Sequence, residues 1–137
     1  MFRSKGAIDM TEIERAIDLV PEGETAIVLL TRGELFTWNA DGTGTTGNWK
    51  FNPNNGRQIS RVIVCYEYND RRSSDVLIAD YVGAVCPIET GRYETDGRWV
   101  IRMAGIHRVG TTRHNWKQFA DAGTNPVRFL SNPPRPR

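Results

Sequence analysis

Six short segments rich in β-branched and aromatic residues, separated by turn-forming residues, constrain the fold of this chain more than any other feature of its sequence. Such segments are typical of β-strands, and the turn formers between them indicate strands that follow one another directly. They cover residues 25–31, 34–38, 61–68, 75–85, 99–109 and 127–130. Because closure removes the exposed edges of a small sheet, the pattern predicts a small, mostly antiparallel β-barrel or a strongly bent sheet.

The order of these segments predicts how some of them pair. Arg32-Gly33 between the first two segments is a turn signal and predicts a hairpin. Residues 61–68 are apolar on both faces of a strand, which is typical of a central strand, and the fifth segment is expected to bend at Gly105. Side chains two residues apart share a face, which predicts a common core. That core is expected to contain Ile27, Leu29, Val62, Val64, Ile78 and Ile101.

A short helix is expected near each end of the chain. Thr11 and Glu14 have the spacing of a capping box and Pro21 stops the apolar pattern, which predicts a helix over 12–20. Thr112 is expected to cap a second helix over 113–122 that ends at Gly123. With the strands, these helices give an α+β fold class: a small β-barrel with two peripheral helices.

Length and apolar content indicate one domain. The 137 residues suit a single core, expected over residues 1–130, with a Pro/Arg-rich tail over 131–137 that cannot enter a sheet. The longest apolar run, residues 26–30, is too short to span a membrane, and the N-terminus does not resemble a signal peptide. A cytoplasmic location is therefore expected.

Residues 39–57 consist largely of turn formers, which predicts a long loop. Trp49 and Phe51 lie within it. Because its neighbours offer little apolar cover, Trp49 is expected to be partly exposed or to line a cleft.

Charge is distributed unevenly along the chain. Residues 97–137 contain eight basic residues and one acidic residue, a net charge of +7, whereas residues 1–34 carry a net charge of −3. A one-sided basic surface attracts polyanions such as nucleic acid. An ordinary solvated face in an Arg-rich protein is the alternative, since the chain has 15 Arg and only 3 Lys.

No motif indicates an enzyme or a cofactor. The sequence has no nucleophile elbow, P-loop or dinucleotide fingerprint, so no catalytic residue and no cofactor are expected. Cys65 and Cys86 lie among apolar neighbours and are expected to be free thiols. They could bind zinc with His107 and His114 only if the fold gathered all four, and no ligand spacing supports this, so no metal site is expected.

Tryptophan residues beside amides and basic residues indicate a possible binding function. Trp38, Trp49, Trp99 and Trp116 are spread along the chain, and two of them adjoin Asn and Lys. Aromatic faces stack on bases, and Arg and Lys pair with phosphate. Each Trp taken alone could equally be a core residue.

The order of elements resembles the PUA-like superfamily and, within it, the EVE-type domains. The late stretches 109–116 and 125–129 are also similar to the ends of small bacterial domains associated with restriction or modification systems. This resemblance implies binding of RNA, or of DNA with a modified base, without a catalytic group. The base would be held in an aromatic pocket.

The resemblance also implies roles for individual residues. Trp38 and Trp49 would be the stacking walls of the pocket, and Asn48 would read the edge of the base. Arg113 and Lys117 would contact the flanking phosphates.

Two other function classes stay open. A protein-interaction module would use the acidic N-terminal helix, or the tail in which Pro133 and Pro136 have P-x-x-P spacing. A small enzyme of unknown reaction is the second alternative.

Overall fold

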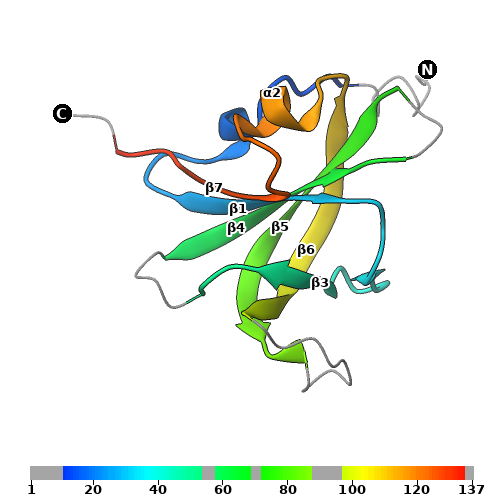
Figure 1. Ribbon diagram of the computed structural model, residues 1–137, viewed down its shortest axis with the longest axis vertical. Helices are drawn as coiled ribbons and strands as arrows, with labels where there is room; N and C mark the ends of the chain where they lie inside the picture. The colour runs from blue at the N-terminus through cyan, green and yellow to red at the C-terminus, as the bar shows by residue number, and fades with distance from the viewer. Residues whose placement is uncertain (1–10, 54–57, 69–71, 88–96, 135–137) are drawn as a thin grey trace.

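One seven-stranded mixed sheet dominates the computed structural model, which describes residues 11–53, 58–68, 72–87 and 97–134 (Figure 1). The strand order is β2-β3-β6-β5-β4-β1-β7, and every neighbouring pair is antiparallel except β1 with β4. The strands are β1 (Thr25–Thr31), β2 (Phe36–Trp38), β3 (Gly44–Lys50), β4 (Ile59–Tyr66), β5 (Ser74–Val85), β6 (Arg98–Thr112) and β7 (Val127–Ser131).

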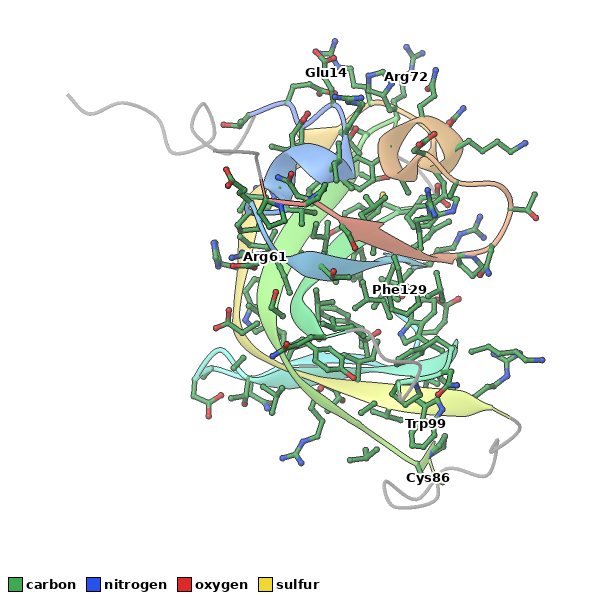
Figure 2. All side chains as sticks on the ribbon, turned by 90° about the vertical axis from the view of Figure 1, so that its left-hand side faces the viewer. Glu14, Arg61, Arg72, Cys86, Trp99 and Phe129 are labelled. Atoms are coloured by element: carbon green, nitrogen blue, oxygen red, sulfur yellow. The ribbon has the colours of Figure 1, made fainter. Side chains whose placement is uncertain are left out.

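The sheet is strongly bent but is not closed into the expected barrel, because β2 and β7 are its two edges and do not pair with each other. The bend still brings distant strands together. Phe51, just after β3, lies 6.0 Å from Phe129 on β7, measured between ring centroids. Figure 2 shows the same curvature from the side, with β1 and β7 above the layer of β3 and β6. The sheet therefore has a concave and a convex face.

The hairpin expected between the first two strands is absent, and β1 lies in the interior of the sheet instead. It pairs in parallel with β4 and antiparallel with β7, while β2 pairs with β3. Residues 26–29 of β1 are fully buried, whereas β2 is partly or fully exposed. A strand that is apolar on both faces is stabilised between two neighbours, whereas a strand as short as β2 is tolerated at an edge.

Two cores, one on each face of the sheet, follow from the alternation of side chains along the strands. The concave core includes Ile27, Leu29, Val62, Val64 and Ile101, all at most 1% exposed, as the sequence predicts. Ile78, expected in the same core, is half-buried against the convex one. The predicted central position of β4 is confirmed, since it lies between β5 and β1.

The N-terminal helix is shorter than predicted. The 3-10 helix η1 covers only Ala16–Leu19. Residues 11–13 run alongside β6 instead, where the Ile13 N–H donates to the Thr111 carbonyl (2.7 Å) and the Thr111 N–H donates to the Thr11 carbonyl (2.8 Å). These two bonds flank an isolated parallel bridge between Glu12 and Thr111.

The C-terminal helix α2 (Trp116–Ala120) is also shorter than predicted and has different ends. Asn115, not Thr112, is its N-cap, and the Asn115 side chain accepts a hydrogen bond from the Gln118 N–H (2.9 Å). Asp121, with φ 52°, ends it in place of Gly123. Thr112 is fully buried at the end of β6. Both helices pack on the convex core (Figure 1).

The long loop expected over 39–57 contains strand β3, which pairs with β2 and β6. A Cβ atom at Gly44 would overlap the Thr37 carbonyl, so glycine permits the close approach of β2 here. Residues 54–57 lie outside the described residues. The bend expected at Gly105 coincides with a register shift in the pairing of β6 with β5.

The expected tail begins later than residue 131. Ser131 belongs to β7 and lies opposite Thr25, and the Asn132 N–H donates to the Glu24 carbonyl (2.9 Å). Residues 135–137 lie outside the described part of the chain. Among the residues that the structure describes, no helix has the length and apolar character needed to cross a membrane.

Candidate functional site

A pocket of about 330 Å³ at one end of the concave core is lined by four aromatic side chains. Phe36 and Trp38 belong to the edge strand β2. Tyr66 is the last residue of β4, and Tyr68 lies two residues beyond the end of that strand. The curvature of the sheet carries β2 across to β4, although three strands separate them in the sheet order. We call this hollow the aromatic pocket.

The rings of this pocket have a defined arrangement. Tyr66 lies between two others: its ring centroid is 5.7 Å from that of Phe36, edge to face, and 5.0 Å from that of Tyr68 at 41°. These separations are in the range of favourable aromatic pairs. Trp38 is 49% exposed, so part of its ring is open to a ligand.

Asp75 of β5 and Arg108 of β6 supply the polar groups of the aromatic pocket. The Tyr68 hydroxyl donates to Asp75 Oδ2 (2.8 Å), and Arg108 Nη2 lies 3.2 Å from Asp75 Oδ1. The Asp75 side chain is 14% exposed and the Arg108 side chain is 30% exposed. The pocket therefore presents both guanidinium N–H donors and carboxylate acceptors to a ligand.

A basic groove of about 310 Å³ adjoins the aromatic pocket, and Tyr68 lines both hollows. Arg32, Arg72 and Arg113 line the groove, and we call it the arginine groove. The Arg113 N–H donates to Glu12 Oε2 (2.9 Å), which ties this backbone to the N-terminal segment. Figure 2 shows Arg72 at the end of the molecule that carries the helices, opposite Trp99 and Cys86.

The structure brings together some of the predicted site residues but not others. Trp38 lines the aromatic pocket and Arg113 lines the arginine groove. Asn48 and Trp49 on β3 do not line the aromatic pocket, and Lys117 is exposed on α2 outside the groove.

Trp49 is more buried than its sequence neighbours suggest. It is 8% exposed, packs in the concave core, and donates from Nε1 to Thr46 Oγ1 (3.0 Å). Trp49 does line a hollow, but a different one from the aromatic pocket, and Arg32 also lines that hollow. Trp116 is a helix anchor: it is buried, and its Nε1 donates to the Asn125 carbonyl (2.8 Å).

Sequence reasoning missed Phe36, Tyr66, Tyr68, Asp75 and Arg108. The spacing of the aromatic residues is a signal that could have identified the walls of the pocket. Phe36 and Trp38 stand two residues apart, and Tyr66 and Tyr68 have the same spacing. Side chains two apart on a strand share a face, so each pair presents two rings to the same side.

The thiols and histidines belong to no cluster of potential metal ligands in the described part of the chain. Cys65 and Cys86 are free, as predicted, and the structure contains no group of three or more potential metal ligands within the residues it describes. Burial raises the pKa of the Cys65 thiol to about 11. At neutral pH this thiol is protonated and therefore a poor nucleophile.

Comparison with known proteins finds no relative, since no family model, no curated protein and no solved structure matches the chain. The site must therefore be interpreted from its own geometry. The aromatic pocket offers stacking faces for a flat ring, and the adjoining arginine groove offers guanidinium donors for an anionic group.

Replacing Trp49 with Phe is expected to remove a blue-shifted, weakly quenched part of the tryptophan emission, because Trp49 is 8% exposed. Trp38→Phe is the matched control and should remove red-shifted emission that acrylamide quenches readily. Emission and acrylamide quenching of both variants measure this. If Trp49→Phe removed the red-shifted component, the burial of Trp49 would be contradicted.

Proposed function

We propose that this protein binds nucleic acid by holding an unpaired base in the aromatic pocket and the adjoining phosphates in the arginine groove. The observation that carries the proposal is the shared wall between the two hollows, which places four aromatic rings next to three arginines. Base–aromatic stacking and arginine–phosphate pairing are the two contacts that single-stranded nucleic acids offer in close sequence.

A base suits the aromatic pocket better than a cationic ligand does. Aromatic rings with a carboxylate also bind quaternary ammonium groups, but such a pocket needs a negative potential. Here Arg108 pairs with Asp75 and places a positive charge in the pocket. A neutral base instead uses both groups, because its ring acceptors take bonds from the guanidinium and its amino groups donate to the carboxylate.

The proposal changes which residues carry the binding. Trp38 keeps the stacking role that the family resemblance implies, while Tyr66 and Tyr68 take the place of Trp49 as the other walls. Asp75 and Arg108 take the place of Asn48 at the edge of the base. Recognition leaves the base unchanged, so it requires neither a catalytic residue nor a cofactor.

The PUA-like interpretation belongs to the same proposal. The mostly antiparallel, strongly bent sheet with helices on its convex face supports it, although the sheet is open. The ligand would then be RNA, or DNA with a modified base that leaves the duplex, encountered in the cytoplasm. Extrusion costs least for a base that is already unpaired or damaged.

Fluorescence anisotropy at low salt tests the proposal directly. Labelled RNA, single-stranded DNA, and duplexes with and without a modified base are titrated with the protein. We expect binding to single-stranded or modified ligands, weaker binding to unmodified duplex, and a loss of affinity when bases are removed but the phosphates are kept. If none of these ligands binds, the proposal fails and a protein-interaction module becomes the better explanation.

Replacing Arg113 and Lys117 together with Ala should weaken binding to all sequences and lower the salt dependence of the affinity. Each lost phosphate contact reduces the slope of log K against log[salt] by roughly 0.7 on a single strand. Because Arg113 lines the groove and Lys117 does not, the single variant Arg113→Ala should account for most of the change. Equal effects of the two single variants would contradict the assignment of the groove.

A further inference from the structure

A second pocket, of about 370 Å³, shares lining residues with the arginine groove. Arg32 and Glu67 line both the groove and this second pocket, just as Tyr68 lines both the groove and the aromatic pocket. The arginine groove therefore adjoins both pockets. The second pocket also includes Glu34 and Trp49 in its walls.

The chemistry of the second pocket differs from that of the groove. Glu34 Oε1 accepts from the Arg32 N–H (3.2 Å), and Glu67 Oε1 accepts from Arg32 Nε (3.1 Å). Glu34 therefore bonds the backbone of Arg32, and Glu67 pairs with its guanidinium. The walls of the second pocket thus contain two carboxylates and one guanidinium, and this excess of negative charge would repel a phosphate that entered here. Carboxylates are instead suited to accept bonds from amino groups such as those of cytosine, adenine and guanine.

We infer that the second pocket holds a second base, one that carries an amino group, from the same strand whose first base occupies the aromatic pocket. This inference rests on the proposed function. The phosphates between the two bases would lie in the groove against Arg72 and Arg113. The ligand is then a single-stranded segment of at least two nucleotides, rather than an isolated nucleotide.

The experiment compares two labelled RNA tetranucleotides, oligo(C) and oligo(U), with the wild-type protein and with Glu34→Gln. Both oligomers carry pyrimidines and the same phosphate charge, but only cytosine has an amino group. Gln keeps an acceptor for the Arg32 N–H, and Glu34 is exposed, so the variant should fold. Glu22→Gln is the matched control, since Glu22 precedes β1 and Glu34 follows it, at opposite ends of the strand.

We expect the wild-type protein to prefer oligo(C), and Glu34→Gln to lower its affinity for oligo(C) by about 5-fold or more, as expected for a lost bond to a charged group. Affinity for oligo(U) should stay the same or rise, because a negative charge is removed. Glu22→Gln should change neither affinity.

If Glu34→Gln raises the affinity for both oligomers equally, Glu34 only repels phosphate and the inference is wrong. If Glu34→Gln leaves both affinities unchanged while Trp38→Ala lowers them, the second base site is overturned and the proposed function stands. If the wild-type protein binds neither oligomer, the second base site is overturned, and the titrations with single-stranded DNA and modified duplexes decide the proposed function.

Discussion

Replacing Val64 with Asp is expected to abolish cooperative folding. Val64 is 1% exposed, in the middle of β4 and within the concave core. A carboxylate there would be buried without a partner or would have to take up a proton, and both are costly. We expect a loss of more than about 4 kcal/mol, a large part of the typical stability of about 5–15 kcal/mol for a domain.

Val82→Asp is the matched control for this prediction. It introduces the same charge on β5 at a side chain that is 56% exposed, so its effect on stability should be small. Far-UV circular dichroism during thermal and urea unfolding measures both variants. A Val64→Asp protein that is soluble and melts cooperatively near the wild-type temperature would overturn the assignment of the core.

Replacing Trp38 with Ala is expected to lower the affinity for a base-containing single strand by about 5- to 150-fold. This range corresponds to the loss of roughly 1–3 kcal/mol for one base stacked on an aromatic ring. Because Trp38 is 49% exposed on an edge strand, the substitution should leave the fold intact. The slope of log K against log[salt] should stay the same, since no phosphate contact is lost.

Trp38→Phe supplies the control, because a phenyl ring keeps an aromatic face and should retain most of the affinity. Anisotropy titrations at several salt concentrations, with the stability of each variant checked by circular dichroism, separate stacking from charge. A Trp38→Ala protein that binds as tightly as the wild type would remove the aromatic pocket as the base site.

The combination of these variants distinguishes the function classes that the sequence leaves open. A protein-interaction module that used the N-terminal segment or the tail would be insensitive to Trp38 and Arg113. A nucleic-acid-binding protein would lose affinity through both, but only the Arg113 variant would lose salt dependence. The two measurements together therefore test the site and the class of ligand.

The sequence by itself determined which side chains are buried in β1, β4 and β6. Val62 and Val64 share a face because the pleat repeats every two residues, and this period can be read in any strand without knowing its partners. The same local reasoning identified β4 as a central strand, since it is apolar on both faces. It failed for β3, because the residues before Trp49 are Gly, Thr and Asn, which form a strand only when β2 and β6 supply partners.

Only the tertiary structure decided the strand order and the candidate site. Pairing β1 with β4 and β7 joins segments far apart in the chain, and no local pattern encodes that choice. The site depends on the same long-range contacts: Trp38 and Arg113 could be nominated by residue type, but Asp75 and Arg108 became site residues only because the bent sheet carries β2 over β4. A pocket forms where surfaces from distant parts of the chain meet in space. Its residues therefore do not have to follow a regular spacing in the sequence.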